Sequence, residues 1–95
     1  MSDRPQLRVI VYDIADNRRR RKVAATLEKR AARVQESVFE ARLSRAQLAR
    51  LHQRLKAHLA EDDSLRIYTI PDAALPRCHV EGGPLLADGA RYWLF

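Results

Sequence analysis

The most constraining feature of this sequence is a predicted strand, Leu7–Tyr12, that carries apolar side chains at odd-numbered and even-numbered positions alike. On one face of the strand lie Leu7, Val9 and Val11, and on the other lie Ile10 and Tyr12. A strand that is apolar on both faces has to be covered on both sides. The chain has 95 residues, which is room for one domain. One cover must therefore be its own helices, and the other could be a second subunit.

A helix and an extended segment are predicted after this strand. Asp16 is suited to cap a helix over Asn17–Ala32, and the buried stripe of that helix would be Val23, Leu27 and Ala31. The segment Arg33–Leu43 then favours extended structure. Its apolar register changes between Val38 and Phe39, so we expect a bulge there or a break into two short strands.

A second helix and a third clear strand complete the predicted core. Ser44 and Gln47 have the spacing of a capping box. The apolar positions that follow at helical spacing are Leu48, Leu51, Leu55 and Leu59. We expect the acidic run Glu61–Asp63 to end this helix. Ser64–Ile70 is then predicted as a strand, which Pro71 closes.

The order β-α-β-α-β with short connections predicts an α/β sandwich, with the helices on one face of a small sheet. At this size the commonest solution is the ferredoxin-like β-α-β-β-α-β arrangement, a mixed α+β fold. That arrangement requires Arg33–Leu43 to supply two strands, which periodicity alone does not decide. We assign residues 1–81 to one domain of this class.

The last part of the chain has weaker signals. Arg77–Val80 could be a short strand, Gly82–Pro84 favours a bend, and Asp88-Gly89 favours a turn. The sequence closes on Tyr92–Phe95, whose large apolar side chains are costly to leave in water. We therefore treat residues 82–95 as an extension that packs on this subunit or, as we expect, on a partner subunit.

The charge balance indicates a polyanionic partner. Eighteen lysines and arginines against twelve aspartates and glutamates give a net charge of +6. All but three of the eighteen are arginines, whose planar guanidinium binds phosphate oxygens two at a time. We therefore expect nucleic acid as a partner.

The expected compartment is a reducing cytoplasm. The single cysteine, Cys78, cannot form an internal disulfide. We see no secretory signal at the start of the sequence. No apolar run approaches the roughly 18 residues that would span a bilayer, so no membrane partner is expected.

Asp13 is the first candidate for chemistry, because it ends the predicted buried strand and α/β domains place ligands beyond the carboxyl ends of strands. Its carboxylate would lie at the edge of the apolar face of Val9 and Val11. Asp13 either terminates the strand and pairs with nearby arginines, or it is a Mg²⁺ ligand. One aspartate per chain suffices for Mg²⁺ if a dimer brings two together. Asp16, by contrast, is explained as a helix cap.

Five consecutive cations, Arg18–Lys22, cover the first turns of the predicted helix. Cations at a helix N-terminus oppose its dipole and repel one another, so we expect a role other than helix stability. The run is either a solvated face or a surface that surrounds phosphate near Asp13. The histidines and Cys78 form no metal-ligand or nucleophile motif, and the sequence has no phosphate-binding loop.

Four segments together carry a resemblance to a known family. They are Val9–Asp16 (V-I-V-Y-D-I-A-D), the arginine run continuing into Lys22–Ala24, Arg33–Glu40 (R-V-Q-E-S-V-F-E) and Arg66–Tyr68 (R-I-Y). The combination of Y-D-I-x-D at the first strand and R-V-Q-x-S-V-F at the second is specific. On these motifs, which span residues 7 to about 70, the chain resembles the CRISPR-associated Cas2 family.

The resemblance implies a ferredoxin-like homodimer whose sheets face each other, with a C-terminal strand that crosses to the partner's sheet. It implies that Asp13 is catalytic and holds Mg²⁺ together with the same residue of the partner chain. With the charge pattern, the expected nucleic-acid-binding residues are Arg18, Arg19, Arg20, Lys22 and Arg33. The supporting motif positions are Tyr12, Asp16, Ser37 and Phe39.

Two roles come with the family. One is metal-dependent endonuclease activity on RNA or DNA, and the other is a dimer that bridges two Cas1 dimers and grips double-stranded spacer DNA. The alternatives are a stand-alone metal-dependent ribonuclease, a non-catalytic scaffold, and a regulatory module for a small ligand, which leaves the charge unexplained. One departure is Arg30-Ala31, where relatives often carry Tyr-Gly. Without that glycine we expect the first helix to end differently, about one turn later.

Overall fold

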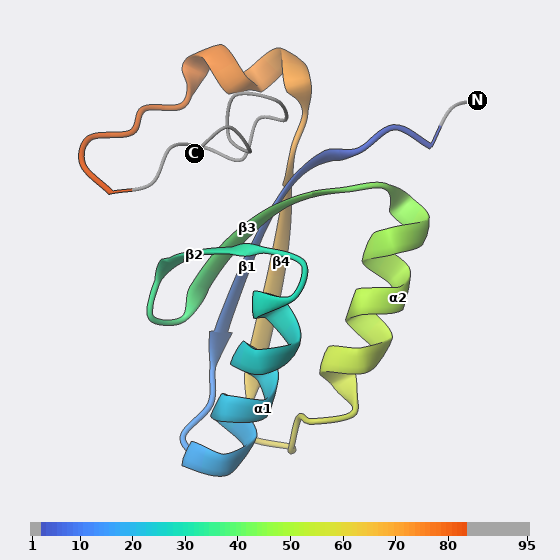
Figure 1. Cartoon of the computed structure of the whole chain (residues 1–95), viewed down its shortest axis with the longest axis vertical. Coiled ribbons are helices and arrows are strands. Elements are labelled where there is room, and N and C mark those ends of the chain that lie inside the picture. Colours follow the sequence, from blue (N-terminus) through green and yellow to red (C-terminus); the bar gives the residue numbers. More distant parts are fainter. Residues whose placement is uncertain (1–2, 84–95) are drawn as a thin grey trace.

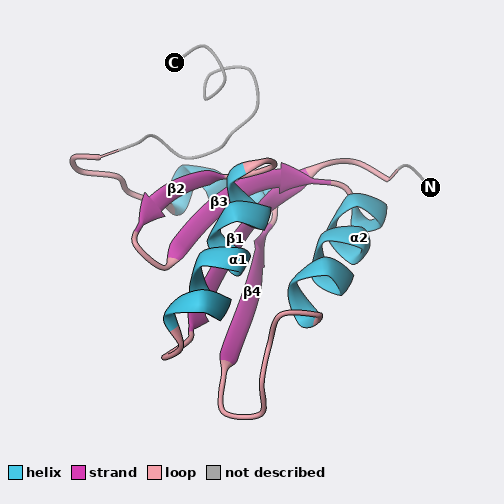
Figure 2. Cartoon of the chain, turned by 60° about the horizontal axis from the view of Figure 1, so that its bottom comes forward, coloured by secondary structure: helices cyan, strands magenta, loops and turns pink. Residues whose placement is uncertain are grey.

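A computed structural model describes residues 3–83 of the chain (Figures 1 and 2). Within this part, the order of the elements confirms the predicted β-α-β-β-α-β arrangement. The elements are β1 (Gln6–Asp13), α1 (Asn17–Glu28), β2 (Ala32–Gln35), β3 (Val38–Leu43), α2 (Arg45–Lys56), β4 (Ser64–Ile70) and a 3₁₀-helix (Asp72–Arg77). Neither α-helix in residues 3–83 is long and apolar enough to cross a bilayer.

The strands form one antiparallel sheet in the order β2-β3-β1-β4. The central strand β1 pairs with β3 on one side and with β4 on the other, so that Ile10 lies opposite both Phe39 and Ile67. Each helix connects two strands that have a third strand between them, since β3 separates β1 from β2 and β1 separates β3 from β4. This is the ferredoxin-like sheet.

Both helices lie on one face of the sheet and enclose the hydrophobic core there (Figure 2). The buried side chains of this cluster include Ile10, Tyr12, Val23, Leu27, Phe39, Ala41, Leu43, Leu51 and Leu55. The predicted helical stripes are confirmed for Val23 and Leu27 of α1 and for Leu48, Leu51 and Leu55 of α2. Ala31 and Leu59 pack partly buried against the same core, but they lie beyond the ends of the two helices. In β1 and β3 the core residues alternate, and in each helix they recur every three to four residues, so each of these elements presents one apolar face to the core. Two short helices therefore suffice to cover one face of the sheet.

The other face of the sheet, which we call the open face, is turned away from the helices. Val9 and Val11 of β1 lie there by strand alternation, and Val11 lies opposite Val38 of β3. These valines are half-buried, and Tyr68, opposite Val9 on β4, is 51% exposed. The prediction that β1 is apolar on both faces is confirmed, and the chain's own helices provide one of its two covers.

The end of α1 differs from the sequence prediction. The helix ends at Glu28, about one turn before the predicted Ala32, and not one turn later as the missing glycine suggested. The backbone N–H groups of Arg30 and Ala31 both donate to the carbonyl of Leu27, at 2.9 and 2.8 Å, and this closes the helix without a left-handed residue. Ala32 leaves the helix because β2 pairs with β3, and a helical periodicity cannot reveal that pairing.

The break in the segment Arg33–Leu43 also lies elsewhere than predicted. The turn occupies Glu36 and Ser37, two residues before the change of apolar register, and β3 runs through Val38 and Phe39 without interruption. Val38 faces the open side and Phe39 faces the core, so β3 resembles β1 in being apolar on both faces. The irregularity in pairing occurs in β2, between Arg33 and Gln35.

The capping box at the start of α2 is confirmed. The backbone N–H of Gln47 donates to Ser44 Oγ at 3.1 Å, and the N–H of Ser44 donates to Gln47 Oε1 at 2.8 Å. The helix ends at Lys56, before the predicted acidic terminator. Asp63 instead closes the turn into β4, where its carboxylate accepts a hydrogen bond from the N–H of Ala60 at 2.8 Å.

After β4, which ends before Pro71 as predicted, the chain forms a 3₁₀-helix. The short strand predicted for Arg77–Val80 is wrong, because Arg77 belongs to the 3₁₀-helix and residues 78–80 pair with no strand of the sheet. Gly82 and Gly83 form the predicted bend, with φ of 73° and 70°. The turn at Asp88-Gly89 and the packing of Tyr92–Phe95 on a partner lie outside the described residues.

Candidate metal site and nucleic-acid interface

Asp13 lies at the carboxyl end of β1, where its side chain is exposed and Ser64 is its cross-strand partner. It has the parity of Val9 and Val11, so it lies on the open face at the end of their row, as predicted. Among residues 3–83, no three histidine, cysteine, aspartate or glutamate side chains are grouped closely enough to hold a metal ion. That Asp13 holds Mg²⁺ together with the same residue of a partner chain stays a prediction.

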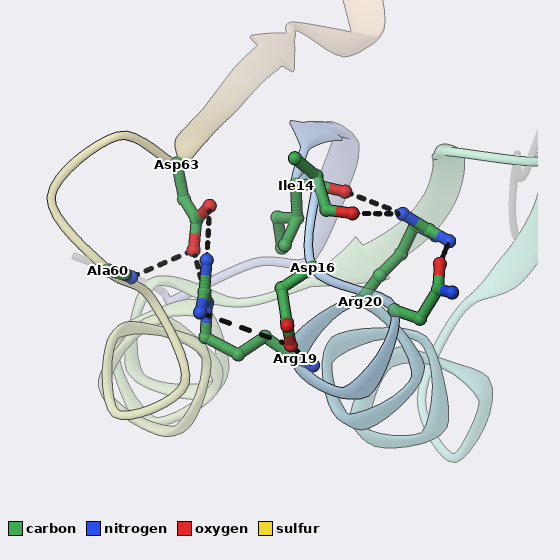
Figure 3. A network of polar contacts seen from close by, with 8 residues as sticks. Ile14, Asp16, Arg19, Arg20, Ala60 and Asp63 are labelled. Atoms are coloured by element: carbon green, nitrogen blue, oxygen red, sulfur yellow. Dashed lines mark hydrogen bonds and ion pairs between the residues drawn. The ribbon is translucent and has the colours of Figure 1, made fainter.

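Asp16 is the N-cap of α1, as predicted (Figure 3). Its carboxylate accepts a hydrogen bond from the backbone N–H of Arg19 at 2.8 Å. This bond stabilises the charged form and lowers the pKa of Asp16 below its ordinary value. The position that the family motif shares is thus occupied here by a helix cap.

Arg19 does not belong to a free cationic surface. Its guanidinium forms a bidentate pair with Asp63, with Nε–Oδ2 at 2.8 Å and Nη2–Oδ1 at 3.1 Å. The Asp63 side chain is only 2% exposed, whereas that of Arg19 is 36% exposed. The hydrogen bond from Arg19 lowers the pKa of Asp63 and in turn raises the pKa of Arg19. This pair joins α1 to the turn before β4 (Figure 3).

Arg20 folds back over the loop between β1 and α1 (Figure 3). Its Nη1 donates to the carbonyls of Ile14 and Ala15, at 2.8 and 3.2 Å, and its Nη2 donates to Asn17 Oδ1. These bonds fix the chain directly after Asp13. Neither predicted alternative, a solvated face or a phosphate surface, therefore describes Arg19 and Arg20, because each has a partner in the fold outside the run Arg18–Lys22.

The remaining cations of the run are Arg18, Arg21 and Lys22, and all of them are exposed. Within residues 3–83 their side chains make neither a hydrogen bond nor an ion pair. They project from the N-terminal turns of α1, whose dipole also favours an anion. These three side chains are the part of the run that remains available for phosphate.

Arg33 lies across a cleft from α1. The guanidinium carbon of Arg33 is 5.0 Å from the centre of the Phe39 ring, a cation–π distance that leaves the N–H groups at the edge free to donate. The cleft has a volume of about 360 Å³. Its lining residues are Tyr12, Asn17, Arg20, Arg21, Ala24, Arg33 and Glu36. The fold thus places Arg33 of β2 across the cleft from Asn17, Arg20 and Arg21 in the first turns of α1.

Tyr12 lines this cleft, and its position is fixed by contacts with the turn at Glu36 and Ser37 and with Phe39. The Tyr12 hydroxyl donates to the carbonyl of Glu36 at 3.2 Å, and the Tyr12 N–H donates to the carbonyl of Ser37 at 3.2 Å. The rings of Tyr12 and Phe39 stack with centroids 6.3 Å apart. The supporting motif positions therefore shape the loops on either side of the cleft.

Arg21 also lines the cleft, although its place in the run Arg18–Lys22 does not distinguish it from its neighbours. A helical signal could have found it, because Arg21 follows Asn17 by four residues and precedes Ala24 by three, and both line the same cleft. Placing that stripe against β2 required the tertiary structure.

Comparisons with known proteins agree with this geometry. The model of the family described as CRISPR associated protein Cas2 matches residues 6–77. The CRISPR-associated endoribonuclease Cas2 3 of Synechocystis is 46% identical over 81 residues, which cover 84% of this chain and 88% of that protein. The crystal structure of Streptococcus pyogenes Cas2 has a TM-score of 0.69 and 28% identity, covering 80% of this chain and 99% of that one.

A further similar chain belongs to a partial Cas6-RT-Cas1–Cas2 complex, with a TM-score of 0.62 and 28% identity over 79% of this chain and 89% of that one. The family match extends over both strand motifs and all the elements from β1 to the 3₁₀-helix. The aspartate that ends the first strand, the basic start of α1 and the arginine of β2 all lie within it. This chain belongs to the CRISPR-associated Cas2 family.

Proposed function

We propose that the protein acts as a nucleic-acid-binding homodimer that bridges two Cas1 dimers in spacer acquisition. We further propose that it hydrolyses phosphodiester bonds with Mg²⁺ held by paired Asp13 carboxylates. One observation carries the proposal: Asp13 ends the half-buried valine row of the open face. A face-to-face dimer along that row would bring two Asp13 side chains together at its edge.

The names of similar proteins support the two functional parts of this proposal. The Synechocystis relative is called an endoribonuclease, which makes RNA the first substrate to test. A chain of similar fold belongs to a complex that contains Cas1, which supports Cas1 as a partner. Double-stranded DNA is the expected ligand of the bridging dimer.

The residues at Asp13 suit a divalent cation if two copies meet. Carboxylate oxygens are the ligands that Mg²⁺ prefers, and one or two of them suffice when water and phosphate complete the shell. When bound, Mg²⁺ would polarise the scissile phosphate and supply a nucleophilic water. Arg20 has a positioning role, because its hydrogen bonds to Ile14 and Ala15 fix the loop that follows Asp13.

The exposed cations would hold the nucleic acid beside this site. Arg18, Arg21 and Lys22 are exposed donors in the first turns of α1, the helix that follows the loop after Asp13. Arg33, also exposed, lies across the cleft from Arg21. Arginine binds phosphate oxygens in pairs, whereas Lys22 contributes a point charge. These residues would neutralise the backbone charge of a bound strand and keep the scissile phosphate close to Asp13.

The test uses the Asp13→Asn variant, with Glu28→Gln as a matched control that removes an exposed carboxylate at the far end of α1. We expect Asp13→Asn to abolish Mg²⁺-dependent cleavage of RNA and DNA oligonucleotides, while duplex binding and the dimer seen by sedimentation stay as in wild type. Glu28→Gln should cleave normally. Cleavage by Asp13→Asn at the wild-type rate would contradict the site. Duplex binding without any cleavage by the wild type would remove hydrolysis from the proposal and leave the scaffold.

A further inference from the structure

A second basic cleft lies in the helix layer, away from the loop that follows Asp13. It has a volume of about 370 Å³. Its lining residues are Arg30, Arg42, Leu43, Gln47, Arg50 and Arg54. Of these six residues, which all lie in the described part of the chain, four are arginines and none carries a carboxylate. Apart from Arg42 and Leu43, the lining comes from α2 and from the turn that follows α1, two parts that Figure 1 shows at neighbouring positions.

The local structure explains why these side chains converge. Gln47, Arg50 and Arg54 follow one another at spacings of three and four along α2, so they form one stripe of the helix. This stripe runs beside the buried positions Leu51 and Leu55, which hold α2 against the sheet. Arg30 follows the end of α1, and the early termination of that helix places it in the turn before β2.

Three of these guanidinium groups have no partner in the described part of the chain. Within residues 3–83, the side chains of Arg30, Arg50 and Arg54 make neither a hydrogen bond nor an ion pair. Arg42 differs, because it pairs with Asp72 at 3.4 Å and donates to the carbonyl of Pro5 at 3.1 Å. Like charges that line one cleft without a carboxylate repel one another, so an anion that joins them is stabilised.

Gln47 adds a neutral donor to the cleft. Its Oε1 accepts the hydrogen bond from the Ser44 N–H in the capping box, which fixes the orientation of the amide. The side-chain NH₂ group therefore remains available to donate. Leu43 is the only apolar side chain that residues 3–83 contribute to the lining, and this polar lining favours a polar ligand over an apolar one.

We infer that this cleft is a polyphosphate-binding site, in which Arg30, Arg50 and Arg54 hold at least two phosphate groups of one ligand. Guanidinium groups bind phosphate oxygens two at a time, and three of them match a multiply charged oxyanion better than a single carboxylate. A nucleic-acid backbone and a free nucleotide polyphosphate share this chemistry. The site uses none of the residues proposed above for cleavage, so phosphate binding at this cleft can be tested independently of Asp13.

The test compares two double variants of α2 that lose the same charge. Arg50→Gln/Arg54→Gln removes two lining cations, and Arg45→Gln/Lys56→Gln removes two exposed cations outside the lining. Arginine, lysine and glutamine have similar helix propensities, so both variants should fold. With inorganic triphosphate as the calorimetric probe, we expect the cleft variant to bind at least about tenfold more weakly than wild type. The control should differ by about twofold or less. Equal binding by the two variants, or no saturable binding by the wild type, would overturn the proposal.

A second arm with duplex DNA distinguishes the two sources of phosphate. If the backbone is the ligand, triphosphate competes with DNA, and the log–log salt slope of the cleft variant falls below that of the control. The expected decrease is about 0.9 for each DNA phosphate that the substituted arginines no longer neutralise. If a free polyphosphate is the ligand, the two variants bind DNA equally while only the cleft variant loses triphosphate. Either result supports the site, and neither depends on cleavage at Asp13.

Discussion

The two faces of the sheet use similar residues in different ways. On the helix face, Ile10, Phe39 and Leu55 have no exposed surface and belong to one cluster. On the open face, Val9, Val11 and Val38 are equally apolar but only half-buried, and they end at the exposed carboxylate of Asp13. The helix face therefore stabilises the chain itself. The open face offers apolar area that association with a second copy would bury.

The same contrast separates the arginines of α1. Arg19 and Arg20 are bound to partners in the fold, and Arg21 and its exposed neighbours are not. A residue that serves the fold and one that serves a ligand can thus be adjacent in a run of identical side chains. Substituting a residue that has a partner in the fold should therefore change the free energy of unfolding, whereas substituting a residue without one should change ligand binding.

The largest effect on folding should come from Phe39→Ala on the helix face. Truncating a fully buried phenylalanine costs about 3–5 kcal/mol in the free energy of unfolding, because a cavity replaces its packing. The substitution also removes the ring beneath Arg33. Urea unfolding measures the loss, and Phe39→Leu, which keeps most of the volume, should cost less. Similar stabilities of wild type and Phe39→Ala would show that the helix face is not the core.

A smaller, pH-dependent effect is expected from Asp63→Asn. The pKa of Asp63 in the folded chain lies below its ordinary value of 3.8 because Arg19 donates to it. Its contribution to stability is therefore complete above that ordinary value and is lost as the pH falls through the lower folded pKa. Unfolding curves should show a gap between wild type and Asp63→Asn near pH 7 that narrows below about pH 4.

Asp62→Asn is the matched control for this pair, because Asp62 is exposed and makes no hydrogen bond or ion pair in the described part of the chain. Its stability should follow that of wild type across the same pH range. A gap for Asp63→Asn that stays constant down to about pH 2 would mean that the Arg19–Asp63 pair is not the cause.

The smallest effect on the chain's own stability should come from the open face, with Val9→Thr/Val11→Thr. Threonine keeps the β-branched shape, and its hydroxyl can stay hydrated at a half-buried position, so unfolding of a single chain should change by about 0.5 kcal/mol or less per site. Association should nevertheless weaken. Sedimentation should show the variant dissociating at concentrations where wild type and the control Val80→Thr remain dimeric, and wild-type Tm should rise with concentration. A variant that stays dimeric would exclude the open face as the dimer interface.

Much of the fold follows from local patterns in the sequence. The alternation of β1, the capping box at Ser44 and the leucine spacing of α2 each predicted an element that the structure contains. The position of Asp13 at the end of a strand apolar on both faces was also predictable, because strand parity fixes the face on which a side chain lies. These features depend only on residues that are neighbours along the chain.

Tertiary structure decided the ends of the elements and the roles of the cations. Helix α1 stops at Glu28 because the following residues pair with β3, and the turn before β3 lies where Tyr12 can hydrogen-bond to it. Arg19 pairs with the carboxylate of Asp63, which lies 44 residues further along the chain. The sequence by itself determined that the chain is basic, that its first element is a strand, and that this strand is apolar on both faces. Which arginines are free to bind phosphate depends on contacts between distant segments, and those exist only once the chain has folded.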